Sequence, residues 1–291
     1  MSQRDNSKYY LPGPSPWPLA FAFSLFLMFV GAGRWLHDLT DGPTVFFTAI
    51  GMIALVLTGW FGTVIRENRA DCYTPRVGSS FRTGMRWLIF SEVVFFSAFF
   101  AALFYTRLWS LPELGGTWYP LTNILLWPDF SFQWPLLDNP DNSKYLGASR
   151  IASPWDIPLL NTLLLLCSVC TFVWAQWGMK RGSRWILKLG LSLTILLGLL
   201  FLALQASEYH ADYTRDGLTL NAGIYGRLFF FLTGFHGLHV AVGVVMLAVM
   251  LGRSLAGHFT PGNHFALEAV GWYWHFVDVV WLLLFVFVYW L

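Results

Sequence analysis

The stretch LSLTILLGLLFLAL, residues 191–204, is almost entirely apolar and carries no charged residue. The strands of a membrane barrel would alternate polar and apolar residues over about ten positions, and this stretch does not alternate. It lies within an apolar run from about 186 to 206, whose one charged residue is Lys188 near its start. At 1.5 Å per residue, such a run is long enough to cross about 30 Å of hydrocarbon as a helix. We therefore predict a membrane-spanning helix over 186–206.

Six further runs of the same kind occur along the chain, separated by clusters of charged, proline and glycine residues. The seven predicted spans lie near 16–36, 44–65, 85–106, 158–178, 186–206, 227–250 and 269–290. Together they cover more than half of the 291 residues. We predict an all-α membrane protein with seven transmembrane helices, organised as a single polytopic membrane domain over 1–291.

The composition excludes an ordinary soluble domain. Hydrophobic residues make up 56% of the chain and charged residues only 12%, whereas a soluble domain carries roughly a quarter charged residues. The formal net charge of +2 is too small to indicate a nucleic-acid partner. The position of the charges is therefore more informative than their sum.

Basic residues predict the orientation, because Lys and Arg accumulate in cytoplasmic loops. The N-terminal tail and the loops after the second, fourth and sixth spans carry 12 of them, and the opposite side carries 6. We expect a cytoplasmic N-terminus and a periplasmic C-terminus. The one long connection, 107–157, would then be an external loop and a surface for contact with other proteins.

Ionisable residues inside the predicted spans are the main candidates for function, because burying them in hydrocarbon is costly. Glu92 lies in the third span. His236 and His239 are three residues apart in the sixth span, and His275 and Asp278 repeat this spacing in the seventh, so each pair is expected on one helix face.

The depths of these groups are comparable in the predicted orientation. Counted from the cytoplasmic span ends, Glu92 lies about 12 Å, Asp278 about 15 Å and His239 about 20 Å into the membrane. Three interpretations remain open from spacing alone. The groups form a hydrogen-bonded network between the third, sixth and seventh spans, handle a proton, or hold one or two metal ions. The unrepeated H-x-x-H favours the structural network.

The fourth and fifth spans are almost wholly aliphatic. We expect no ionisable residue at depth there and no chemistry. Cys167 and Cys170 form a C-x-x-C inside the fourth span, without a second cysteine pair to complete a zinc site. We expect them to act as small buried apolar residues.

Several stretches in this order resemble subunit III of the haem-copper cytochrome c oxidases. They are PSPWPLAFAF (14–23), VIREN (64–68), YTPRVGSSFRTGMRWLIFSEVVFF (73–96), PLLNTLLLLCS (158–168), EYHADYTRDG (208–217), GIYGRLFFFLTGFHGLHVAVG (223–243) and HFALEAVGWYWHFVDVVWLLLFVFVYW (264–290). The last two are the most specific. The connection from Arg107 to Asp156 departs from the family by being longer and more irregular.

The resemblance implies a fold and a role. The first two spans would be splayed from a bundle of spans 3 to 7, with phospholipid in the cleft between them. The chain would be a non-redox core subunit of a proton-pumping oxidase, with no catalytic residue and no metal of its own. Haem and copper would lie in partner subunits I and II, and cytochrome c would donate electrons to the complex. Its work would be to support proton uptake, protect the active centre from inactivation, and deliver lipid and oxygen.

The resemblance also implies two sets of site residues. Those of the buried polar network are Glu92, His236, His239, His275 and Asp278, whose match to family motifs favours the structural interpretation over a metal site. Those that would bind lipid head groups are Arg66, Glu67, Arg253 and His258. Basic residues also simply end helices in the cytoplasm, which is the alternative for Arg66 and Arg253.

Two other classes of function remain open. One is an independent membrane carrier of protons or solutes that uses Glu92. The other is a membrane metalloenzyme that uses His236, His239 and His275. For either class or for the oxidase subunit, we expect a multi-pass protein of a bacterial inner membrane.

The predicted orientation has a direct test. A reporter enzyme that is active only outside the cytoplasm should work when it is fused after Leu291 and fail when it is inserted near Gly182, because the basic loops stay inside. The reverse pattern of reporter activity would show that the orientation is wrong.

Overall fold

Seven long apolar helices run through the chain, as the sequence predicts. The computed structural model describes residues 10, 11, 13–70, 72–151, 153–260 and 262–291. The helices long and apolar enough to cross a membrane are Trp17–Leu36, Gly42–Arg69, Pro75–Leu114, Ile157–Lys180, Arg184–Asp216, Ile224–Leu255 and Phe265–Trp290. The described residues form no strand, and one isolated bridge pairs Thr260 with Asn263. The predicted fold class is confirmed in its helical content and its seven candidate spans.

The chain divides into two compact units, Met1–Gly84 and Met85–Leu291. The first unit contains α1 (Trp17–Leu36), α2 (Gly42–Arg69) and the first turns of α3 (Pro75–Tyr105). The second unit contains the rest of α3 and the four remaining long helices. These are α6 (Ile157–Lys180), α7 (Arg184–Ala211), α8 (Ile224–Leu255) and α9 (Phe265–Leu284).

In the first unit, α1 and α2 form a close antiparallel pair. A Cβ atom built on Gly31 of α1 would lie only 2.5 Å from the backbone nitrogen of Phe46 on α2. Glycine at this position therefore lets the two backbones approach each other. The turn between the helices is closed by Arg34, whose Nη2 donates to Asp41 Oδ1 at 2.8 Å. This hydrogen bond lowers the pKa of Asp41.

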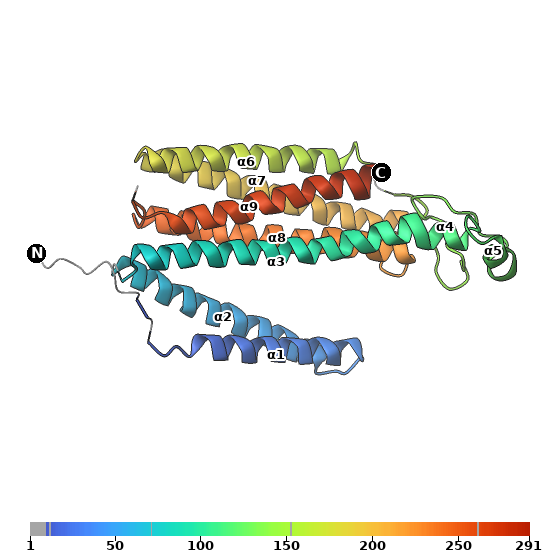
Figure 1. Ribbon diagram of the computed structural model, residues 1–291, viewed down its shortest axis with the longest axis horizontal. Helices are drawn as coiled ribbons and strands as arrows, with labels where there is room; N and C mark the ends of the chain where they lie inside the picture. The colour runs from blue at the N-terminus through green and yellow to red at the C-terminus, as the bar shows by residue number, and fades with distance from the viewer. Residues whose placement is uncertain (1–9, 12, 71, 152, 261) are drawn as a thin grey trace, which may run out of the picture. The chain divides into compact units, whose positions relative to one another are not determined.

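In the second unit, α9 packs against α6 and α8, and α7 packs against α6 and α8. Figure 1 shows these helices running along one another, with α9 in red between α6 and α8. Among the described spans, α9 is the most enclosed. The interior includes Phe172, Leu191, Leu247 and Trp274, all with no exposed surface.

Tryptophan side chains connect α9 to α6 by hydrogen bonds. Trp274 Nε1 donates to Ser168 Oγ at 3.0 Å, and Trp281 Nε1 donates to Thr162 Oγ1 at 2.9 Å. All four side chains are buried. Each indole thus fills interior volume with its rings and satisfies its N–H on the neighbouring helix.

The helix that contains the third predicted span continues beyond the end predicted near 106. α3 continues through a π-helical turn, η1 (Thr106–Ser110), into α4 (Leu111–Leu114), and a further short helix, α5, spans Pro120–Leu126. Leu111 is only 3% exposed, so burial of this apolar side chain stabilises helical structure beyond the uncharged run. The first part of the connection expected over 107–157 is therefore helical.

The remainder of the connection is folded onto the second unit. Asn139 Nδ2 donates to the carbonyl oxygen of Tyr145 at 2.9 Å, and the Ser149 backbone N–H donates to the carbonyl oxygen of Asp216 at 2.9 Å. Leu136 is buried. These contacts give the connection a fixed structure next to the end of the fifth span.

One prediction is corrected here, and one helix extends past its predicted span. α7 continues beyond the predicted end near 206 to Ala211, and a π-helical turn, η2 (Asp212–Asp216), follows it. Cys167 and Cys170 are both exposed rather than buried. α6 turns Ser168 and Phe172 toward the bundle, and this rotation leaves the two cysteines on its outer surface.

Candidate functional site

Glu92 on α3 and His239 on α8 are in contact inside the second unit. Glu92 Oε2 lies 3.0 Å from His239 Nε2, and the two side chains are 29% and 14% exposed. The other ring nitrogen, Nδ1, lies 2.6 Å from the carbonyl oxygen of Phe235, one helical turn earlier. The imidazole is thus held by a backbone oxygen on one side and a carboxyl group on the other.

This geometry determines how many protons the pair holds. A carbonyl oxygen only accepts hydrogen bonds, so Nδ1 of His239 must carry a proton. The contact between Nε2 and Glu92 Oε2 then needs one more proton, placed on either atom. In both arrangements the pair has no net charge. With the proton on Glu92 both groups are uncharged, and with the proton on His239 they form an ion pair, so neither arrangement buries an unpaired charge.

Aromatic rings enclose His239. The ring centroids of Phe95 and Phe96 on α3 lie 6.0 and 5.0 Å from the imidazole centroid. The Tyr273 ring on α9 stacks with the imidazole at 6.4 Å, and its hydroxyl donates to the carbonyl oxygen of His239 at 3.3 Å. Contacts at this position therefore join α3, α8 and α9.

His236, three residues before His239 on α8, contacts different helices. Its side chain is 1% exposed and lies 5.7 Å from the Phe201 ring of α7 and 5.2 Å from the Trp281 ring of α9. Neither ring nitrogen has a hydrogen-bond partner among the described residues. The two histidines thus have separate surroundings, although the spacing predicts a shared helix face.

Asp278 and His275 lie on α9. Asp278 is 5% exposed, and its two carboxyl oxygens have no hydrogen-bond partner in the described part of the chain. The half-buried His275 ring lies 6.0 Å from the Phe172 ring. Of the five residues expected in the polar network, the structure brings Glu92 and His239 together.

A second polar cluster, not anticipated from the sequence, lies at the end of α7. Gln205 Oε1 accepts from Asn161 Nδ2 of α6 at 3.2 Å, and Gln205 Nε2 donates to Glu208 Oε2 at 3.0 Å and to the Tyr289 hydroxyl at 3.2 Å. Tyr289 belongs to η3 (Phe285–Trp290), which follows α9. All four residues are buried. Asp212, also buried, follows Glu208 by one helical turn.

Glu208 and Asp212 lie beyond the predicted fifth span, so the expectation of no ionisable residue at depth in the fourth and fifth spans did not cover them. The signal was present in the sequence, since Gln205, Glu208 and Asp212 follow one another at intervals of three and four residues and therefore lie on one helix face. Ending the span at 206 removed two of the three from consideration. Across the described residues, no group of three or more His, Cys, Asp and Glu side chains is arranged to hold a metal ion.

In the first unit, the two residues expected to bind lipid lie at the end of α2. Arg66 is exposed, and its Nη2 donates to Thr63 Oγ1 at 3.2 Å. Glu67 accepts a hydrogen bond from the Tyr73 hydroxyl at 2.8 Å. Burial, together with this bond and the nearby negative charge, raises the pKa of Tyr73. The guanidinium of Arg66 is accessible from outside this unit.

In the second unit, the other two residues lie at the end of α8. Arg253 is half-buried, and its Cζ lies 4.7 Å from the centroid of the Phe259 ring. Its Nε has no hydrogen-bond partner among the described residues. The backbone N–H of His258 donates to the carbonyl oxygen of Arg253 at 3.0 Å. Stacking on Phe259 and the folded chain after α8 thus fix the position of this guanidinium.

Comparison with known proteins gives matches along nearly the whole chain. The family described as cytochrome c oxidase subunit III matches residues 7–140 and 144–291. A protein of Oryctolagus cuniculus named cytochrome c oxidase subunit 3 is 40% identical over 283 residues, which are 97% of this chain and 96% of the relative. Proteins of the same name from Danio rerio and Cyprinus carpio are 42% and 43% identical over 287 and 285 residues, with the same coverage.

Replacing Glu92 tests the contact between α3 and α8. Glu92→Gln should be tolerated, because the amide N–H can donate to Nε2 of a neutral His239. Glu92→Leu should leave Nε2 unsatisfied and lower the free energy of unfolding by about 1 to 3 kcal/mol. Thermal unfolding of the purified protein in detergent measures both effects.

The exposed Glu113 supplies the matched control. Glu113→Leu removes a carboxylate without removing a buried partner and should change the unfolding temperature little. Equal losses of stability in Glu92→Leu and Glu113→Leu would contradict the proposed role of the pair. So would a stoichiometric metal ion that wild-type protein binds and Glu92→Gln loses.

Proposed function

Because the chain belongs to the cytochrome c oxidase subunit III family, we propose that it is a non-redox core subunit supporting the oxygen chemistry of its partners. It is a subunit of the cytochrome c oxidase complex and an integral membrane protein with seven helices able to span a bilayer. In this proposal the complex pumps protons, haem and copper lie in the catalytic subunit I and in subunit II, and cytochrome c supplies electrons to the complex. The chain itself has no catalytic residue.

The Glu92–His239 contact supports this role. It holds one shared proton between α3 and α8 with no net charge, and aromatic rings from two helices surround it. A pair of this kind stabilises the helix arrangement and offers one exchangeable proton. Both properties suit a subunit that keeps proton uptake fast and protects the active centre of a partner from inactivation.

The surroundings of the histidines favour this role over a metalloenzyme. His236 lies among rings of α7 and α9, whereas His239 is bonded to Glu92 on α3. Two imidazoles directed to different helices do not share a ligand position. The family match over residues 7–140 and 144–291 offers no support for a separate proton or solute carrier that uses Glu92.

The location in the cell is also part of the proposal. The excess of basic residues in alternate loops favours an N-terminus in the cytoplasm and a C-terminus in the periplasm of a bacterial inner membrane. In this position the chain can retain phospholipid and guide oxygen through lipid toward its partner.

Removing the subunit from the purified oxidase tests the supporting role. The visible spectrum of the haem groups should stay unchanged, because this chain supplies no haem ligand, while turnover at neutral pH should slow or decay faster. Absorption spectra and oxygen consumption during sustained turnover measure the two effects. Restoring the purified chain should restore the lifetime, and loss of haem on its removal would disprove the proposal.

The lipid-binding part of the proposal concerns Arg66, Glu67, Arg253 and His258. Arg66 and Arg253 end long apolar helices, where phosphate groups of the bilayer lie. The planar guanidinium can donate two parallel hydrogen bonds to a phosphate. Arg66 is exposed, and Arg253 has an Nε without a partner among the described residues. Each arginine is therefore proposed to bind a phospholipid head group in its own unit.

Replacing both arginines tests their binding of lipid. An oxidase carrying Arg66→Gln and Arg253→Gln should retain less phospholipid through delipidating purification and lose activity sooner, because two phosphate contacts are removed. Phosphorus analysis and activity decay measure these effects. The control oxidase carries Arg181→Gln and Lys188→Gln, which remove two charges elsewhere. An equal loss of lipid in the control would mean that surface charge, rather than these positions, retains the lipid.

A further inference from the structure

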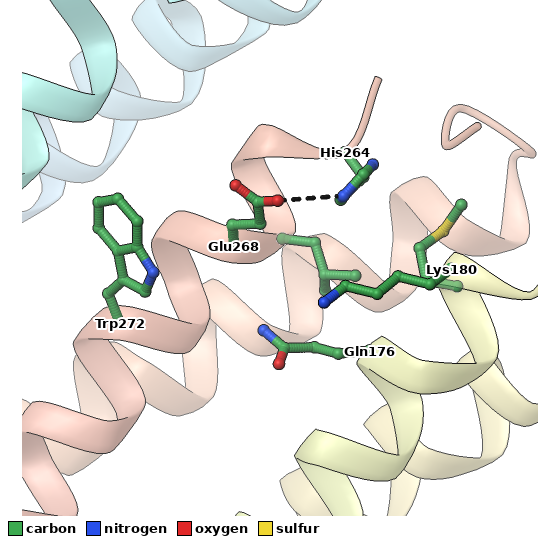
Figure 2. Close-up of a pocket in the computed structure, with 7 residues that line it drawn as sticks. Gln176, Lys180, His264, Glu268 and Trp272 are labelled. Atoms are coloured by element: carbon green, nitrogen blue, oxygen red, sulfur yellow. Dashed lines mark ion pairs between the residues drawn. The ribbon is translucent and has the colours of Figure 1, made fainter. Parts of the chain in front are cut away.

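A cavity of about 290 Å³ lies between the end of α6 and the beginning of α9. Figure 2 shows Gln176 and Lys180 reaching from α6 toward the first turns of α9, which carry His264, Glu268 and Trp272. The whole cavity lies within the second unit. None of these five side chains belongs to the network or lipid sites described above.

The cavity lies where two apolar spans end. The long apolar run of α6 stops at Lys180, and α9 begins at Phe265. Since both helices cross the hydrocarbon layer, their neighbouring ends lie at its surface, next to the lipid head groups. Trp272 lines the cavity. Tryptophan is enriched at the membrane–water interface of membrane proteins, which agrees with this position.

The charges around the cavity leave one cation without a partner. His264 Nε2 lies 3.1 Å from Glu268 Oε1, so the partner of this carboxylate oxygen is the imidazole and not Lys180. Lys180 is exposed and has no ion-pair partner among the described residues. An ammonium group at the mouth of the cavity attracts anions and repels metal ions.

The remaining polar groups add hydrogen-bond donors. The Lys180 ammonium has three N–H groups, the Gln176 amide has two and the Trp272 indole has one. The lining also includes apolar side chains, among them Leu267, which is 1% exposed. Several donors together with apolar side chains suit a phosphate ester, whose oxygens accept hydrogen bonds and whose carbon-bearing part avoids water.

We propose that this cavity binds the phosphate of a membrane phospholipid head group, with Lys180 supplying the charge and Gln176 and Trp272 supplying further donors. The site is separate from Arg66 and Arg253, so lipid can bind in this cavity whether or not it binds at those arginines. The volume is at the lower end of the range for small-molecule sites and fits a head group rather than a larger ligand.

The test uses the assembled oxidase and a phosphatidylglycerol that carries a photoactivatable group next to its head group. After illumination, peptide mass spectrometry should locate cross-links at 176–180 and 264–272. Lys180→Gln should reduce this cross-linking about fivefold, the effect of one charge at a membrane surface. Trp272→Phe keeps an aromatic ring but removes the N–H donor, and should reduce cross-linking by a smaller factor.

Lys188→Gln is the matched control, because Lys188 lies near the start of α7 and does not line the cavity. It should cross-link like the wild type, and co-purification of each variant chain with the haem-bearing subunits in wild-type amounts should show that all three variants assemble. Equal losses in Lys180→Gln and Lys188→Gln would overturn the proposal, as would unchanged cross-linking in Lys180→Gln. Competition by millimolar glycerol phosphate would show that a soluble phosphate, and not a lipid, is the ligand, and would also overturn it.

Discussion

A polar side chain inside hydrocarbon has no water to bond, so it must find a partner on another helix or on its own backbone. This constraint explains how α9 is held in the second unit. Its tryptophans donate to α6, Tyr273 donates to a carbonyl of α8, and Tyr289 in the following η3 turn accepts from Gln205 on α7. Because the donors and acceptors are carried on large rings, the same side chains fill the interior and bond the neighbouring helices.

Ionisable groups face a stricter form of the same constraint, because an unpaired charge costs more to bury than a hydroxyl or an amide. Glu92 and His239 avoid an unpaired charge by sharing a proton, which leaves the pair with no net charge whichever atom holds it. Glu208 meets it by accepting hydrogen bonds from Gln205 and, at 3.5 Å, from Tyr289. The first pair is partly exposed and the second group is enclosed. The Glu92–His239 pair is therefore the better placed of the two for proton exchange with surroundings outside the unit.

The seven spans were predictable because the length of an uncharged apolar run reports directly on its ability to cross hydrocarbon. The ends of the helices were not, since helices continue beyond the apolar runs where side chains such as Leu111 and Glu208 are buried by tertiary contacts. The contact of Glu92 with His239 was anticipated as part of a network. The separation of His236 from His239 was not, because the i, i+3 spacing specifies the helix face but not which neighbouring helix covers each side of it.

Many polar side chains inside the second unit are bonded to another helix, although His236 and Asp278 have no partner among the described residues. A side chain already bonded to another helix has little to offer a ligand, so recognition shifts to the ends of the spans. There the guanidinium of Arg253 lies 4.7 Å from the centroid of the Phe259 ring. Stacking on a ring holds a guanidinium in place while leaving its N–H edge able to donate. Cations at the ends of apolar helices lie at the level of the lipid phosphates, which is why a phospholipid is the ligand proposed for Arg253.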